Sequence, residues 1–127
     1  MTDITGFGLM GHVLEMAGGS GCSAIIDYAN VPLIEGLQSY ITQRISPDAT
    51  PRNWNAYSSK VKFEKGVNVM EAFTVLPDPQ TNGGLLISCT PSALREVQQL
   101  LNENGLGTHI NPIGKIIAQA EVPLLVK

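Results

Sequence analysis

Four residues near the start of the chain have the types and spacing of a site for phosphate and a cation. Asp3 stands two positions before Thr5, and Thr5 opens a turn that contains Gly6 and Gly8. The apolar residues that follow recur at helical spacing, so this turn is expected at the start of a helix. Unpaired amides and the helix dipole favour phosphate there, and a carboxylate suits a hard cation such as Mg²⁺. A capping or turn role for Asp3 fits the same residue equally well.

The same glycines also match the dinucleotide-binding fingerprint, because Gly6, Gly8 and Gly11 have the spacing G-x-G-x-x-G. Asp27 ends the next apolar run, about where a ribose-binding carboxylate would lie. However, the fingerprint requires an apolar strand that leads into its first glycine. Only five residues precede Gly6, and several of them are polar. The sequence therefore disfavours a nicotinamide or flavin enzyme.

A second group of turn residues, which we call the second motif, spans residues 76–84 and reads Leu-Pro-Asp-Pro-Gln-Thr-Asn-Gly-Gly. Gly83 and Gly84 are expected to allow a tight turn or a close approach of two backbones. Asp78 and Thr81 are expected to stabilise that turn through bonds to the backbone. In the first motif, which spans residues 2–12, the last residue is a histidine. It is expected to lie near the core or to cap a contact.

The elements that must position these motifs alternate between helices and strands. Periodicity predicts helices over 8–17, 33–45 and 69–73, and strands over 23–28, 60–64, 85–89, 114–118 and 123–126. A further helix should follow Thr90 as its N-cap, with Pro91 in the first helical position and Gly105 as its stop. Residues 46–58 show no clear period and are predicted to form a long loop. The alternation predicts one α/β (α+β) domain over residues 1–127, with a mixed β-sheet flanked by helices.

Composition narrows the class of protein. Charged residues make up 15% of the chain, against about 25% in an average soluble domain, which indicates a surface covered by another domain or subunit. The formal net charge is −3 without a Lys/Arg cluster, so no nucleic-acid partner is expected. No apolar run approaches the ~20 residues of a membrane helix, and no signal peptide is recognisable, so a cytoplasmic location is expected. Cys22 and Cys89 lack metal-site spacing and are expected to be reduced, buried thiols.

Both motifs resemble those of a known family. Residues 2–12, Thr-Asp-Ile-Thr-Gly-Phe-Gly-Leu-Met-Gly-His, resemble the segment that opens the C-terminal half of selenophosphate synthetases. Residues 78–86 resemble the second signature of these enzymes, although Asn82 stands where the family usually has Ser. Residues 51–53, Pro-Arg-Asn, form a weaker match between the two, and residues 113–116 are similar to the family's closing strand.

The resemblance implies a fold like the C-terminal domain of aminoimidazole ribonucleotide synthetase. It also implies the reaction of selenide, water dikinase, in which ATP, selenide and water give selenophosphate, phosphate and AMP, with Mg²⁺ required. By the same resemblance, Asp3 is a metal ligand. Together with the free amides expected at the helix start, this predicts that Thr5, Gly6 and Gly8 lie near the ATP phosphates. The other metal ligands, the catalytic Cys or selenocysteine and the essential Lys belong to the family's N-terminal half, which also forms its homodimer. This chain would therefore be the C-terminal half of a two-domain ATP-dependent synthetase, without catalytic residues and inactive alone.

Two alternatives stay open. The chain could be the C-terminal domain of another member of the same superfamily, such as a hydrogenase-maturation or purine-biosynthesis enzyme. It could also be a free-standing binding module without chemistry of its own. Dependence of ATP consumption on selenide separates the selenophosphate synthetase assignment from both alternatives.

Overall fold

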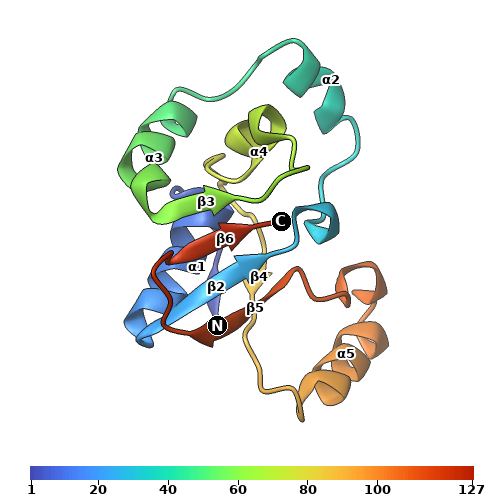
Figure 1. The fold of residues 1–127 in the computed structure, drawn as a ribbon. Coiled ribbons are helices and arrows are strands. Elements are labelled where there is room, and N and C mark those ends of the chain that lie inside the picture. Colours follow the sequence, from blue (N-terminus) through green and yellow to red (C-terminus); the bar gives the residue numbers. More distant parts are fainter.

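A four-stranded mixed sheet forms the centre of the computed structural model, which describes all residues from 1 to 127 (Figure 1). The strand order is β3 (Val61–Phe63), β6 (Leu124–Val126), β2 (Cys22–Ile26) and β5 (Gly114–Ala118). Strand β2 runs parallel to β6 and antiparallel to β5, and β6 runs parallel to β3. The predicted α/β domain with a mixed sheet is therefore confirmed.

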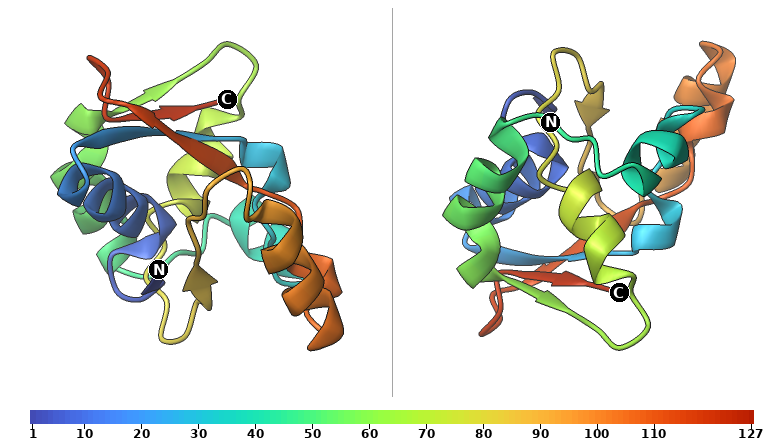
Figure 2. Two further views of the ribbon diagram at one scale, coloured as in Figure 1. Left: turned by 90° about the horizontal axis from the view of Figure 1, so that it is seen from below. Right: turned by 90° about the horizontal axis from the view of Figure 1, so that it is seen from above.

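Five helices accompany the sheet: α1 (Gly8–Gly19), α2 (Leu37–Thr42), α3 (Ala49–Tyr57), α4 (Val69–Val75) and α5 (Leu94–Glu103). Single 3-10 turns occur at η1 (Tyr28–Asn30), η2 (Ser58–Lys60) and η3 (Gly107–His109). Helices α1, α3 and α4 lie on the same side of the sheet in both views of Figure 2, and the opposite face is uncovered. Along β2 the side chains alternate accordingly, because successive strand residues point to opposite faces. Ala24 and Ile26 are buried beneath the helices, and Ile25 between them is only half-buried.

The hydrophobic core lies between α1, the end of α4 and the two central strands. Its members are Met10, Val13, Leu14, Ala17, Ala24, Ile26, Ala72, Leu76, Leu124 and Val126. The four that α1 contributes recur at helical spacing, which is why this helix presents one apolar face to the sheet. Helix α1 is thus anchored along its length, and the turn that precedes it is held beside the core.

An aromatic cluster joins three further elements. The Trp54 ring of α3 stacks on Phe63 of β3 with 5.9 Å between the ring centroids. It meets Phe73 of α4 edge-on at 5.1 Å, a favoured arrangement for aromatic pairs. This cluster fixes α3 against the sheet and α4.

Several predicted elements were wrong in extent. The long loop predicted over residues 46–58 contains helix α3, which is mostly polar and so shows no apolar stripe in the sequence. The helix predicted over 33–45 shrinks to α2, because Gly36 has a left-handed backbone with φ of 83° that cannot continue a helix. The strand predicted over 85–89 shrinks to β4 (Leu85–Leu86) and pairs with β1 (Thr2–Asp3), not with the main sheet.

Helix α5 also begins later than predicted. Thr90 and Pro91 lie in a preceding turn, where the Ala93 amide donates to the Thr90 carbonyl at 3.0 Å, so Thr90 is not the N-cap. Gly105, with φ of 78°, follows the helix end as predicted. Both cysteines are free, as predicted, but Cys22 is only half-buried and Cys89 is exposed, so their predicted burial was wrong. None of the helices combines the length and apolar character needed to cross a membrane.

Candidate functional site

The backbone around Asp3 is bonded to the end of the second motif. Asp3 pairs with Leu85 in the antiparallel sheet of β1 and β4. The next residue, Ile4, donates to the Gly84 carbonyl and accepts from the Gly83 amide, both at 2.9 Å. A Cβ atom on Gly83 would lie 2.8 Å from the Ile4 carbonyl oxygen, so the predicted close backbone approach at this glycine is confirmed.

The start of α1 rests on the beginning of the second motif. Gly8 has a left-handed backbone with φ of 68°, and a Cβ atom there would lie 2.6 to 2.9 Å from backbone atoms of Leu76, Pro77 and Asp78. The Met10 amide, which the first turn of the helix leaves free, donates to the Leu76 carbonyl at 2.9 Å. Only glycine allows the two backbones to meet at this distance.

Asn53 of α3 joins the two motifs. Its side-chain amide donates to the Gly6 carbonyl at 2.8 Å and to the Pro77 carbonyl at 2.9 Å. Only 9% of Asn53 is exposed; its bond to Pro77 is buried and its bond to Gly6 is partly buried. Sequence reasoning noted residues 51–53 only as a weak match, because a polar residue in a segment without periodicity gives no sign that it is buried. The one available signal was the resemblance itself.

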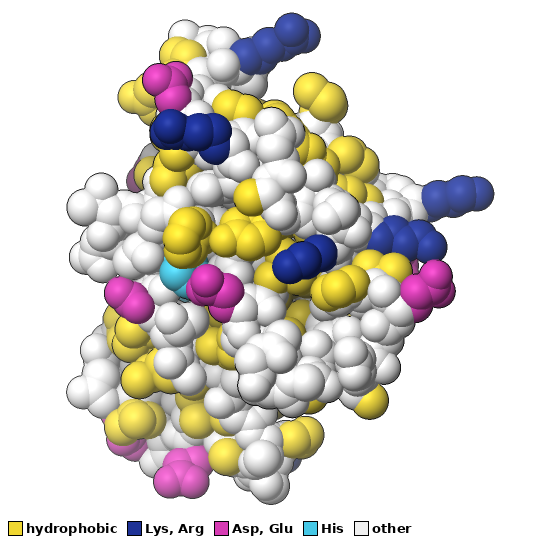
Figure 3. All heavy atoms as spheres, turned by 90° about the vertical axis from the view of Figure 1, so that its left-hand side faces the viewer, with side chains coloured by type: hydrophobic (Ala, Val, Ile, Leu, Met, Phe, Trp, Pro, Cys, Tyr) yellow, Lys and Arg dark blue, Asp and Glu magenta, His cyan; other side chains and the backbone are white.

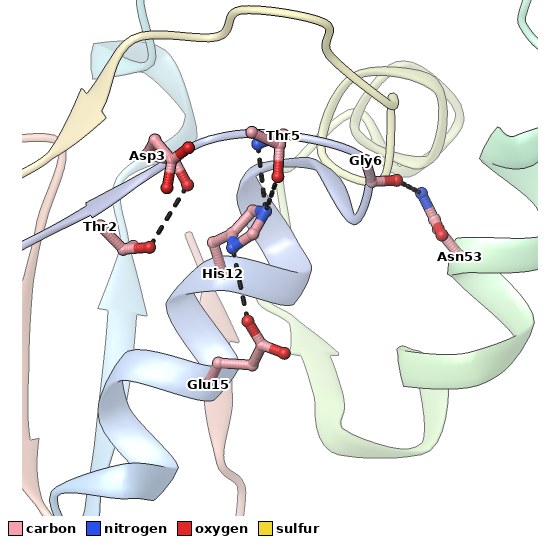
Figure 4. Close-up of polar contacts among 7 residues, drawn as sticks. All are labelled: Thr2, Asp3, Thr5, Gly6, His12, Glu15 and Asn53. Atoms are coloured by element: carbon pink, nitrogen blue, oxygen red, sulfur yellow. Dashed lines mark hydrogen bonds and ion pairs between the residues drawn. The ribbon is translucent and has the colours of Figure 1, made fainter.

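His12, the last residue of the first motif, bonds back to the turn at Thr5 (Figure 4). Its Nε2 atom accepts from the Thr5 amide at 3.0 Å and lies 3.2 Å from the Thr5 hydroxyl. A backbone amide can only donate, so Nε2 carries no proton and Nδ1 carries it instead. Nδ1 lies 3.4 Å from a carboxylate oxygen of Glu15. The prediction that His12 lies near the core or caps a contact is confirmed, since 6% of the residue is exposed.

Asp3 has a solvent-facing carboxylate that is not engaged by another side chain. The residue is exposed, and its carboxylate has no hydrogen-bond partner within the chain. Hence the carboxylate oxygens remain available to a cation, and a hard cation prefers such ligands. The chain holds no group of three or more His, Cys, Asp or Glu side chains placed to bind a metal ion. Asp3 by itself therefore does not make a metal site.

The amides of the first motif differ in what they can still bind. The Thr5 amide donates to His12, and the Gly8 amide donates to the Thr5 carbonyl at 3.0 Å. The amides of Gly6 and Phe7 have no acceptor within the chain, and both residues are exposed. Of the three residues expected near phosphate, only Gly6 has an amide that is free to donate.

The second motif holds one partly buried carboxyl group, that of Asp78. Asp78 accepts bonds from the hydroxyl of Thr50, at 3.4 Å, and from the side-chain amide of Gln80. These partners are side chains, whereas bonds to the backbone were predicted for Asp78. Burial raises the pKa of the Asp78 carboxyl above its ordinary value, although both hydrogen bonds act in the opposite direction.

The surface around the site is mixed in character. Figure 3 views the face that carries α1 and α3, where histidine atoms are visible between acidic side chains and hydrophobic groups lie nearby. Phe7, which is 48% exposed, packs its ring against Tyr57 with 6.3 Å between centroids. Burial and the nearby Glu15 charge raise the pKa of the Tyr57 hydroxyl.

The chain was compared with protein families and with curated proteins of known name. The whole chain, residues 1–127, matches the family model described as AIR synthase related protein, C-terminal domain. A protein named selenide, water dikinase from Bordetella bronchiseptica is 41% identical over 119 residues. Proteins of the same name from Dechloromonas aromatica and Paraburkholderia xenovorans are 39% and 43% identical over 116 and 107 residues. The matches cover 94%, 91% and 84% of this chain but 33%, 33% and 30% of the relatives, so the chain spans about a third of their length.

Proposed function

The chain belongs to the family described as AIR synthase related protein, C-terminal domain, and we propose that it serves as the C-terminal domain of a selenide, water dikinase. The complete enzyme would convert ATP, selenide and water into selenophosphate, phosphate and AMP. One observation carries the proposal. Both motifs that resemble the selenophosphate synthetase signatures meet in one bonded unit, with the free carboxylate of Asp3 at its surface.

The amount of exposed surface supports a missing partner domain. The accessible surface is 8265 Å², whereas a compact monomer of 13.6 kDa exposes about 6,600 Å². Several large apolar residues contribute to the excess, among them Ile34 (78% exposed), Met70 (73%), Leu85 (62%) and Leu100 (60%). We propose that an N-terminal domain of the same protein covers part of this surface, and that the complete protein is a cytoplasmic homodimer.

In this proposal Asp3 supplies one oxygen ligand to Mg²⁺, and the rest of the ligand set belongs to the N-terminal domain. Bound Mg²⁺ would neutralise charge on the ATP phosphates, which is its usual contribution to phosphoryl transfer. Gly6 would donate its amide to a phosphate oxygen, and Thr5 and Gly8 would shape the turn that presents it. These residues bind and orient, so the chain alone is proposed to be inactive.

Phosphorus NMR of the complete protein with ATP, Mg²⁺ and selenide tests this function. We expect selenophosphate and AMP from the parent protein and from Asp48→Asn, a control that removes an exposed carboxylate at the start of α3. In Asp3→Asn we expect the rate to fall on the order of 10²-fold, because charge stabilisation in the transition state is weakened. ATP consumption that does not require selenide would instead indicate another member of the superfamily. No ATP consumption at all would favour a binding module.

A further inference from the structure

His12 is held rigidly in the second turn of α1. Only 6% of His12 is exposed. Its ring also lies against Phe7, with 5.8 Å between the ring centroids. The direction of the imidazole is therefore set by packing, and its nitrogen atoms present fixed positions to the turn above (Figure 4).

The peptide group between Ile4 and Thr5 has both polar atoms bound. Its carbonyl oxygen accepts from the Gly83 amide at 2.9 Å, and its N–H donates to Nε2 of His12 at 3.0 Å. The plane of this peptide is thus fixed from two sides. Asp3 precedes Ile4 and Gly6 follows Thr5, so the free carboxylate and the free amide belong to the residues on either side of this fixed peptide.

Glu15 lies on the other side of the His12 ring from Thr5, beside Nδ1. Its carboxylate lies 3.4 Å from Nδ1 of His12, and the Glu15 side chain is 56% exposed. A carboxylate beside Nδ1 favours the tautomer that carries its proton there, which leaves Nε2 free to accept from Thr5. The buried histidine can then hold the Thr5 amide through Nε2.

We propose that His12 is a positioning residue, which holds the Ile4–Thr5 peptide so that the Asp3 carboxylate and the Gly6 amide meet metal and phosphate in the correct orientation. This role rests on the proposed function, because it concerns the same site. In this role His12 binds neither ligand and acts through the Thr5 amide.

Two substitutions in the complete protein separate positioning from simple packing. In His12→Gln the side-chain oxygen can still accept from the Thr5 amide, whereas His12→Phe fills the space without an acceptor. We expect His12→Phe to raise the apparent Mg²⁺ activation constant about tenfold, the effect of one lost hydrogen bond, and His12→Gln to stay within about threefold of the parent. The control His109→Phe changes an exposed histidine in η3 and should leave the constant unchanged. Equal activation constants for His12→Phe and His12→Gln would overturn the proposal. A rise in the activation constant that only parallels a fall in the melting temperature Tm would overturn it as well.

Amide hydrogen exchange supplies a measurement that does not depend on activity. We expect the Thr5 amide to exchange faster in His12→Phe and at nearly the parent rate in His12→Gln. If the parent makes no selenophosphate, the proposed function fails, yet the exchange rates still show whether His12 holds this peptide. Unchanged Thr5 exchange in His12→Phe would overturn the positioning role while leaving the proposed function intact.

Discussion

The side-chain amide of Asn53 donates a 2.8 Å hydrogen bond to the carbonyl oxygen of Gly6, which lies 47 residues earlier in the chain. The second hydrogen of the same amide goes to the carbonyl of Pro77 at 2.9 Å. One side chain of α3 thereby ties the first motif to the second. Because both hydrogens of the amide are used, a replacement must offer two donors at the same reach.

Asn53→Asp keeps the shape of the side chain but replaces its donors with an acceptor. The Gly6 and Pro77 carbonyls would then face a carboxylate oxygen, so we expect the free energy of unfolding to fall by about 2–4 kcal/mol. Asn55→Asp is the matched control in the same helix, and because Asn55 is exposed it should change stability by less than about 0.5 kcal/mol. Urea unfolding measures both. Similar losses in the two variants would show that the Asn53 bonds contribute little.

Gly8 and Gly6 are expected to respond differently to alanine. At Gly8 a methyl group would lie within 2.9 Å of the second motif, and φ is positive. Gly8→Ala should therefore lower the free energy of unfolding by more than about 3 kcal/mol. At Gly6 a methyl group would meet nothing within 4 Å, so Gly6→Ala should fold nearly normally. Thermal unfolding compares the two. If Gly8→Ala is as stable as Gly6→Ala, the two motifs do not meet as described.

Asp78 makes stability depend on pH. Its pKa is raised above the ordinary 3.8, so the native state holds this proton more tightly than the unfolded chain. The resulting contribution to stability is fully present below pH 3.8 and is lost as the pH rises through the raised native pKa. Asp78→Asn does not titrate, so its stability relative to the parent should increase across this window.

The pH dependence is checked by urea unfolding of Asp78→Asn and of the parent at two pH values. One pH lies just below 3.8 and the other about two units higher. Asp48→Asn is the control because its carboxylate is exposed. A difference between Asp78→Asn and the parent that stays constant with pH, or that matches the Asp48→Asn control, would contradict the burial of the charged group.

Trp54 is the centre of the aromatic cluster that fixes α3. Trp54→Ala removes its contacts with Phe63 and Phe73, and because Trp54 is half-buried we expect a loss of about 3 kcal/mol in the free energy of unfolding. Trp54→Phe should lose about half as much, since one ring remains. Circular dichroism follows unfolding without the tryptophan signal. Tyr40→Ala, at a 55% exposed position in α2, is the control, and an equal loss there would show that the cluster is not specially stabilising.

Periodicity predicted the elements that bury an apolar face. The stripe of α1 and the strands β2, β3, β5 and β6 were all found near their predicted positions, because burial imposes a regular pattern on such residues. The same reasoning missed α3, whose residues are mostly polar and show no apolar stripe. It also extended α2 and strand β4 too far, because apolar residues there remain partly exposed instead of entering the core.

By itself the sequence determined the alternation of helices and strands, the apolar face of α1 and the two motifs with their family resemblance. Those features are local, since each depends on residues within a few positions of one another. Only the tertiary structure decided that Asn53 joins the motifs, that His12 occupies the Thr5 amide and that Asp3 stays free. The Asn53 bonds join segments far apart in the chain, and the His12 bond depends on how the turn folds back onto its helix, so a buried polar residue is recognised only when its partners are known.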